Sequence, residues 1–122
     1  MKGSFAWGKG AMIVEGVYSY LDTGGEQTVY ENTNTNRKII RGVFLDLVNM
    51  TQNGTVKVYC KIDGTNYREF YSKDFTVATD SDGLHIDLNF MVIHSLKITY
   101  TEQSNEGAAR AIPYIFSYEN RM

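Results

Sequence analysis

The residues that could act as a nucleophile and its base are few in this chain. Cys60 is the single cysteine, and the only histidines are His85 and His94. Nucleophilic catalysis needs a serine or cysteine beside a base, commonly in a recognisable turn, and no Gly-x-Ser-x-Gly pattern is present. Cys60 also shares its alternation with Val56 and Val58, which favours a small core residue over a reactive thiol. We therefore expect no enzymatic activity.

Patterns that bind metals are equally sparse. No close pair of the Cys-x-x-Cys type, typical of zinc sites, occurs. The run His85-Ile86-Asp87 places an imidazole and a carboxylate on one strand parity, which we interpret as a solvated face. The run Asp80-Ser81-Asp82-Gly83 gathers oxygen ligands suited to calcium, but turns require the same residue types. We predict no resident metal or cofactor and an ordinary turn at 80–83, with calcium as the alternative.

Charge and hydropathy exclude further partners. Twelve Lys and Arg against fourteen Asp and Glu give a net charge of −2, which disfavours nonspecific binding to nucleic acid. No apolar run approaches the ~20 residues that span a bilayer. The first residues lack the apolar core of a secretory signal, and a single cysteine fits a reducing compartment. We expect synthesis in a cytoplasm and neither nucleic acid nor membrane as a partner.

The elements that would position these groups are strands. Period-two alternation is clearest in 55–62 and in 96–101, and no segment carries an apolar stripe of helical period. Turn signals such as Asn53-Gly54 and Asp63-Gly64 separate the runs. About eight strands are predicted: 11–21, 27–30, 38–48, 55–62, 67–75, 84–90, 96–101 and 111–118. We predict an all-β, single-domain antiparallel β-sandwich, jelly-roll-like, over residues 11–122, with residues 1–10 as an N-terminal arm.

Two strands carry more specific expectations. Residues 11–21 are apolar on both parities, which indicates a strand covered on both faces, and Gly16 suggests a bulge in its middle. Pro113 has no N–H to give to a ladder, so the strand 111–118 is expected at a sheet edge or a bulge.

Aromatic residues supply the candidate contacts. Phe5 and Trp7 lie in the glycine-broken arm, which we expect either to fold back on its own domain or to insert into a neighbouring subunit. On the predicted hairpin, Tyr59, Tyr67 and Tyr71 are candidate interface residues. An outward Tyr59 would stack on a ligand or a neighbouring subunit, or else pair across strands within one sheet.

Three segments carry a family resemblance. They are residues 56–68 (Val-Lys-Val-Tyr-Cys-Lys-Ile-Asp-Gly-Thr-Asn-Tyr-Arg), 96–100 (Leu-Lys-Ile-Thr-Tyr) and 107–114 (Gly-Ala-Ala-Arg-Ala-Ile-Pro-Tyr). Together they resemble small β-sandwich structural proteins of tailed-bacteriophage virions, such as capsid decoration proteins. The resemblance implies a non-enzymatic homo-oligomer that contacts itself, the major capsid protein or another virion protein, and that resides in the virion, in head or tail.

A second interpretation stays open from the same residues. A strand, an Asp-Gly turn, a tyrosine and a further strand also occur in carbohydrate-binding sandwiches. The chain would then be a carbohydrate-binding module or adhesin domain, with a glycan held by exposed tyrosines and by polar residues of 22–36 and 63–67.

Overall fold

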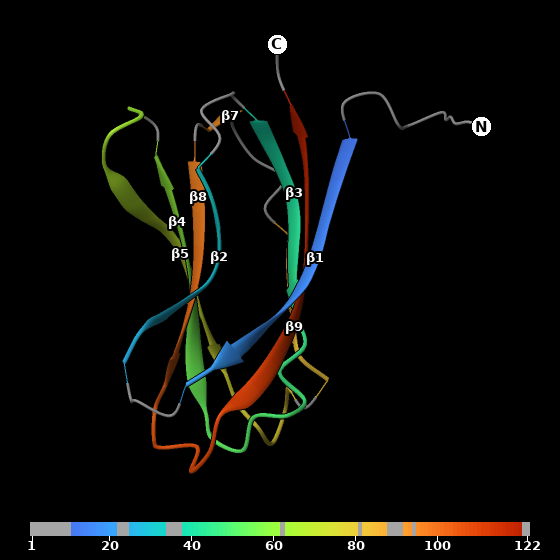
Figure 1. Ribbon diagram of the computed structural model, residues 1–122, viewed down its shortest axis with the longest axis vertical. Helices are drawn as coiled ribbons and strands as arrows, with labels where there is room; N and C mark the ends of the chain where they lie inside the picture. The colour runs from blue at the N-terminus through green and yellow to red at the C-terminus, as the bar shows by residue number, and fades with distance from the viewer. Residues whose placement is uncertain are drawn as a thin grey trace, which may run out of the picture.

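The described part of the chain is built from strands in two layers. The computed structural model describes residues 11–21, 25–33, 38–61, 63–80, 82–87, 92–93 and 95–120. Two antiparallel sheets face each other as a sandwich (Figure 1). Within these residues no helix could span a bilayer. The strands are β1 (Ala11–Tyr20), β2 (Gln27–Asn32), β3 (Lys38–Leu45), β4 (Gly54–Lys61), β5 (Tyr67–Phe75), β6 (Leu84–Asp87), β7 (Val92–Ile93), β8 (Ser95–Glu102) and β9 (Arg110–Asn120).

The strand order is that of a jelly roll. One sheet runs β1-β9-β3-β6 and the other β2-β8-β4-β5. β6 and β7 pair with successive stretches of β3, so they act as one interrupted edge strand. The pairs β1 with β9, β2 with β8, β3 with β6 and β7, and β4 with β5 are nested, as in one long hairpin wound over on itself. Eight strand positions in two such layers confirm the predicted sandwich.

The core lies between the two sheets, where the period-two pattern places it. β4 has the strict burial alternation that its sequence predicts, and β8 buries Leu96, Ile98 and Tyr100. From the facing sheet, β9 contributes Ile112 and Phe116, both fully buried. The inward parity of these strands is therefore confirmed.

Two expectations about the β1-β9-β3-β6 sheet are wrong. The register of β1 with β9 is unbroken through Gly16, so no bulge is present. A Cβ at Gly16 would lie 2.5 Å from the Tyr114 hydroxyl oxygen, so the glycine permits a close approach instead. Pro113 lies in a strand paired on both sides, and the register shift between β9 and β3 falls at Ser117 and Tyr118, away from Pro113. It is tolerated because β3 ends at Leu45, and the Pro113 carbonyl accepts a 2.9 Å hydrogen bond from the N–H of Asp46 beyond that end.

The expected cover on both faces of β1 is also wrong for the isolated chain. The side chains of Ile13, Val17 and Leu21 are 60%, 67% and 52% exposed. The reason is architectural, because a two-layer sandwich covers only one face of each sheet. The second apolar parity of β1 consequently points outward.

Candidate functional site

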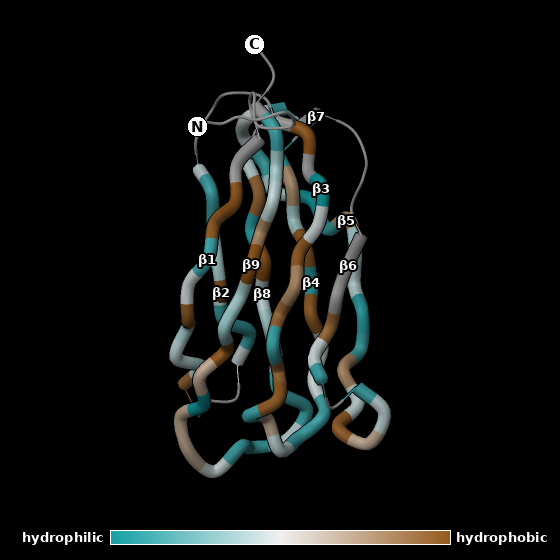
Figure 2. Tube along the Cα trace, turned by 90° about the vertical axis from the view of Figure 1, so that its right-hand side faces the viewer, coloured by the Kyte–Doolittle hydropathy of each residue, from teal (hydrophilic) through white to brown (hydrophobic). Residues whose placement is uncertain are grey.

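The outer face of the β1-β9-β3-β6 sheet carries apolar side chains in rows across the strands. Directly opposed residues in an antiparallel sheet project to the same face. Val17 is opposite Pro113, and Ile115 lies between Glu15 on β1 and Phe44 on β3. Ile115 is 43% exposed. Figure 2 looks onto this face, with β1 at its left edge. We call Ile13, Val17, Phe44, Pro113 and Ile115 the outer apolar face.

This face is hollowed around Phe44 and Ile115. A depression of about 460 Å³ is lined by four members of this face, Val17, Phe44, Pro113 and Ile115, together with Glu15 and Asp46. A smaller hollow of about 100 Å³ continues past Phe44 and Ile115 toward Ser117. The arrangement offers an apolar floor with acidic groups at its margin, which suits contact with another macromolecule.

The outer face of the β2-β8-β4-β5 sheet is different, because its aromatic and charged groups engage one another. The Tyr59 hydroxyl donates a 2.6 Å hydrogen bond to Glu26, and the Tyr67 hydroxyl donates one of 2.6 Å to Glu31. The Lys97 amino group lies 4.9 Å and 4.7 Å from the centroids of the two tyrosine rings. We call Tyr59, Tyr67, Lys97, Glu26 and Glu31 the tyrosine–lysine cluster.

Electrostatics ties this cluster together. The hydrogen bond to Glu26, followed by burial, raises the pKa of Tyr59 to about 12. Burial and the hydrogen bond to Glu31 raise the pKa of Tyr67 well above its ordinary value. Burial also acts to raise the pKa of Glu26, but hydrogen bonds from Thr99 and Tyr59 and the nearby lysine charges outweigh it and hold that pKa below its usual range.

The structure separates the predicted interface residues. Tyr59 and Tyr67 lie on the outer face of their sheet, where their hydroxyls donate hydrogen bonds to Glu26 and Glu31 of the same chain. Tyr71 is opposite Val58 and packs against the core, so it lies apart from that cluster. Phe5 and Trp7 lie outside the described residues.

The outer apolar face was missed as a site from sequence. Its signal was present in the second apolar parity of β1, at Ile13, Val17 and Leu21. That signal was interpreted as internal cover, because sequence alone does not say how many layers a fold has.

The acidic turn at 80–83 is held by its own carboxylate. Asp80 Oδ2 accepts a 2.9 Å hydrogen bond from the Thr76 N–H, and Gly83 takes a φ of +104°. Positive φ is the conformation for which glycine is suited. The Gly83 N–H then donates to the Asp80 carbonyl at 2.8 Å, which is the geometry of an ordinary turn. Ser81 and His94 lie outside the described residues. In the part that is described, no group of three or more His, Cys, Asp or Glu could hold a metal ion.

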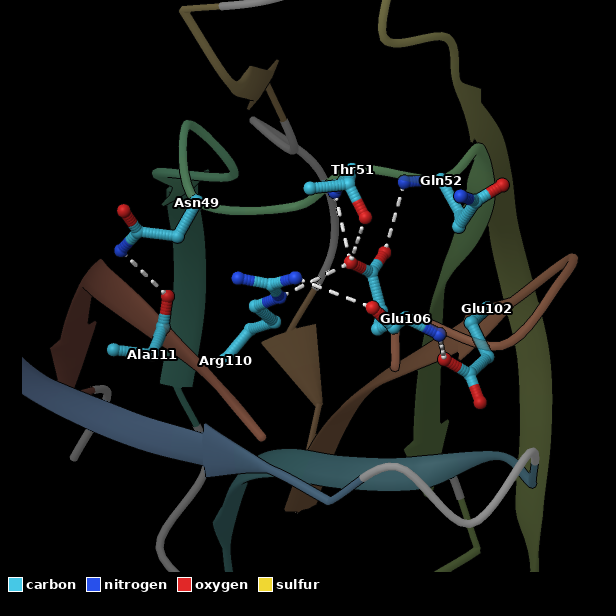
Figure 3. Close-up of polar contacts among 7 residues, drawn as sticks. All are labelled: Asn49, Thr51, Gln52, Glu102, Glu106, Arg110 and Ala111. Atoms are coloured by element: carbon cyan, nitrogen blue, oxygen red, sulfur yellow. Dashed lines mark hydrogen bonds and ion pairs between the residues drawn. The ribbon is translucent and has the colours of Figure 1, made fainter. Parts of the chain in front are cut away.

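A buried carboxylate joins two loops at one end of the sandwich (Figure 3). The Glu106 side chain is fully buried and accepts hydrogen bonds from the Thr51 N–H and hydroxyl, both 2.8 Å, and from the Gln52 N–H at 3.0 Å. Arg110 Nε lies 3.5 Å away and supplies the opposite charge. Every oxygen of this carboxylate is engaged, so the group serves to fix the loops.

Cys60 occupies the predicted core position. Its side chain is fully buried in β4, and burial raises the pKa of the thiol to about 12. A thiol in that state supplies almost no thiolate at neutral pH, so it is inert as a nucleophile.

Comparison with known proteins establishes the fold. No protein-family model matches the chain, and no curated protein matches its sequence. Similar solved structures include PirA, with a TM-score of 0.59, 14% identity, and coverage of 84% of this chain and 92% of PirA. The mitogen of Yersinia pseudotuberculosis has a TM-score of 0.53 and 12% identity, covering 90% and 86%. CBM32-3 from a family 31 glycoside hydrolase of Clostridium perfringens has a TM-score of 0.52 and 12% identity, with coverage of 93% of this chain and 78% of CBM32-3. At these identities the likeness shows a shared β-sandwich fold alone.

Proposed function

We propose that this protein is a non-enzymatic structural component of a bacteriophage virion, of the capsid decoration type or a related one. It assembles through protein–protein contacts on the outer apolar face. The observation that carries the proposal is the exposure of aliphatic side chains in register on one outer face, while the opposite outer face is internally paired.

The energetic argument rests on apolar area. Burying apolar surface contributes about 25 cal/mol per Å², and contiguous exposed patches mark interaction sites on soluble proteins. Ile13, Val17 and Ile115 share one face with Phe44, and Val17, Phe44 and Ile115 line a hollow in it. Covering this face against a partner removes that surface from water. The tyrosine–lysine cluster gains less from a partner, because its two tyrosine hydroxyls are already hydrogen-bonded to Glu26 and Glu31.

The virion context is supported by two further features. Segments 56–68, 96–100 and 107–114 resemble small structural proteins of tailed phages, and they form β4 with its following turn, much of β8, and the start of β9. The jelly roll is an architecture that recurs in viral capsid and lectin domains. A rigid sandwich with one adhesive face suits a lattice component.

The test is the protein content of virus particles. Particles produced by a host that carries this gene are purified by density gradient and analysed by quantitative mass spectrometry. We expect the chain at a fixed ratio to the major capsid protein, and an Ile115→Asp variant should be lost from particles while still folding. The matched control, Val48→Asp, replaces an exposed valine outside this face and should be retained. Absence of the unaltered chain from particles would overturn the proposed role.

A carbohydrate-binding module or adhesin domain is the second candidate. Tyr59 and Tyr67 lie close together on one outer face, near the carboxylates of Glu26 and Glu31, as in a platform for a sugar. The ammonium groups of Lys97 and Lys61 sit over these rings, so a sugar would have to displace them. A glycan array distinguishes the two functions, because binding that is lost in Tyr59→Ala would support this candidate and a blank array would remove it.

A further inference from the structure

We infer that β1 pairs antiparallel with β1 of a second copy about a two-fold axis at Val17, so that one sheet continues through both subunits. This inference rests on the proposed role as an assembling protein and adds the partner and the register. Three observations carry it: the direction of the backbone groups on β1, the point where its edge is already closed, and the self-complementarity of its outward side chains.

The first observation is that β1 presents unpaired backbone groups. Among the described residues β1 pairs with β9 alone, so it is an edge strand. Residues directly opposite in an antiparallel pair either exchange both backbone hydrogen bonds or turn them away from each other. Val17 is opposite Pro113, whose carbonyl accepts its hydrogen bond from Asp46 on the β3 side. The Val17 N–H and C=O therefore point to the free edge.

The second observation is a boundary on that edge. The Leu21 N–H donates a 2.8 Å hydrogen bond to the Gln27 side-chain oxygen, and the Leu21 carbonyl accepts one from the Gln27 amide nitrogen. Gln27 thus occupies the edge position at Leu21. By the alternation along a strand, the backbone groups of Ile13, Glu15 and Ser19 point the same way as those of Val17. No described residue bonds to them, so the open stretch runs from residue 13 to residue 19.

The third observation is the fit of β1 to itself. With Val17 opposite Val17 of the second copy, Ile13 comes beside Leu21 of that copy, and Glu15 faces Ser19, whose hydroxyl can donate to the carboxylate. These are the three most exposed aliphatic residues of β1 and its end, matched in one row. A register centred on Glu15 would oppose two carboxylates, and one centred on Gly16 would put Glu15 against Val17. Of these registers, only the one centred on Val17 matches all three exposed aliphatic residues with aliphatic partners and opposes no two carboxylates.

A long apolar edge strand is a template for pairing with another chain, and proteins generally blunt such edges with lysine, proline or a bulge. Residues 11–20 contain no lysine and no proline, and the register with β9 shows no bulge. Pairing two copies removes both edges and places two outer apolar faces on one continuous surface. That surface is the one that the proposed function assigns to lattice contacts.

The experiment compares two exposed valines. Val17 is 67% exposed and Val48 is 59% exposed, so neither Val17→Asp nor Val48→Asp should disturb the core. Sedimentation velocity over a concentration series should show a dimer for the unaltered chain and for Val48→Asp. Val17→Asp should weaken dimerisation at least about tenfold, because it opposes two carboxylates across the axis. A monomeric unaltered chain, or equal weakening by both variants, would overturn the inference.

Disulfide trapping tests the register without relying on stability. Hydrogen-bonded opposite residues have Cα atoms about 5.5 Å apart, within the range that a disulfide bridges. Val17→Cys should therefore cross-link to a dimer on mild oxidation, and a mixture of Glu15→Cys and Ser19→Cys chains should cross-link to each other. Ser19→Cys alone should stay monomeric, because the two cysteines would be about 13 Å apart. Cys60 is fully buried, so it should not form an intermolecular disulfide under these conditions. A cross-link of Ser19→Cys alone with none for Val17→Cys contradicts the register.

The two proposals fail separately. If the chain is present in particles at a fixed ratio but is monomeric, and Val17→Cys gives no cross-link, only the β1 dimer is contradicted. If the chain dimerises through β1 but is absent from particles, only the virion role is contradicted.

Discussion

The hydroxyl of Tyr20, at the end of β1, accepts a 2.9 Å hydrogen bond from the backbone N–H of Glu102, at the end of β8, and so joins the two sheets. The same hydroxyl donates to the Gly25 carbonyl at 3.0 Å. The rings of Tyr20 and Tyr100 meet edge to face, 5.3 Å between centroids, and both residues are fully buried. The Tyr100 hydroxyl, by contrast, has no hydrogen-bond partner among the described residues.

Removing these two hydroxyls should have opposite effects. Tyr20→Phe leaves the buried N–H of Glu102 without its acceptor and should lower the free energy of unfolding by about 1–3 kcal/mol. Tyr100→Phe deletes an unpaired buried hydroxyl and should leave the free energy unchanged or raise it by up to about 1 kcal/mol. Urea denaturation of both variants checks this. Greater destabilisation by Tyr100→Phe would contradict the hydrogen bonding described.

The buried Glu106 carboxylate, which joins the two loops, should contribute more to the free energy of unfolding than a surface ion pair between the same residue types. Glu106→Ala leaves the N–H groups of Thr51 and Gln52 and the charge of Arg110 without their acceptor, and should cost about 3 kcal/mol of unfolding free energy.

The control is Glu119→Ala. Its carboxylate lies 2.6 Å from Arg41, but both side chains are substantially exposed, so the loss should stay below about 1 kcal/mol. Thermal unfolding of both variants measures the difference. Equal losses would mean that the burial of the Glu106 carboxylate adds nothing to stability.

Cys60 should be unreactive in the folded protein. Its thiol is fully buried and its pKa is raised to about 12, so labelling by an aromatic disulfide at neutral pH should wait for global unfolding. The measured labelling rate should rise with denaturant and follow the unfolded population. The variant Val48→Cys gives the control, because Val48 is 59% exposed and lies outside the outer apolar face, so its added thiol should be labelled at once. Prompt labelling of the unaltered chain would contradict the burial.

The hydrogen bond between Tyr59 and Glu26 should be detectable as a raised ionisation midpoint of the Tyr59 phenol at high pH. The raised pKa of about 12 means that the fold retains the Tyr59 proton where an unfolded tyrosine, with a pKa of about 10, has lost it. The resulting contribution to stability is fully present below pH 10 and is lost as the pH rises through about 12. An ultraviolet titration of the unaltered chain minus Tyr59→Phe should have its midpoint near 12.

Glu26→Gln is the matched variant for this titration. It removes the negative charge and the charged acceptor, so the Tyr59 midpoint should move down toward 10. A Tyr59 midpoint near 10 in the unaltered chain would show that the phenol is not paired with Glu26 in solution.

Much of the fold could be predicted from the sequence because strands have a two-residue period. The alternation in 55–62 and 96–101 identifies the buried sides of β4 and β8, and the turns at 63–66 and 80–83 are marked by Asp and Gly. The candidate site was less accessible. Whether Tyr59 is free or engaged depends on Glu26, which lies 33 residues away in the chain.

The sequence by itself determined which side chains share a face of each strand, including the inward Cys60 and the second apolar parity of β1, since residue type and alternation are local properties. Only the tertiary structure decided which strands are central and which are edges. Pro113 is accommodated in a central strand because β3 ends beside it, and Val17 is exposed because β1 has one neighbour and the sandwich has two layers. Pairing between strands far apart in sequence sets these relationships, and no local pattern encodes them.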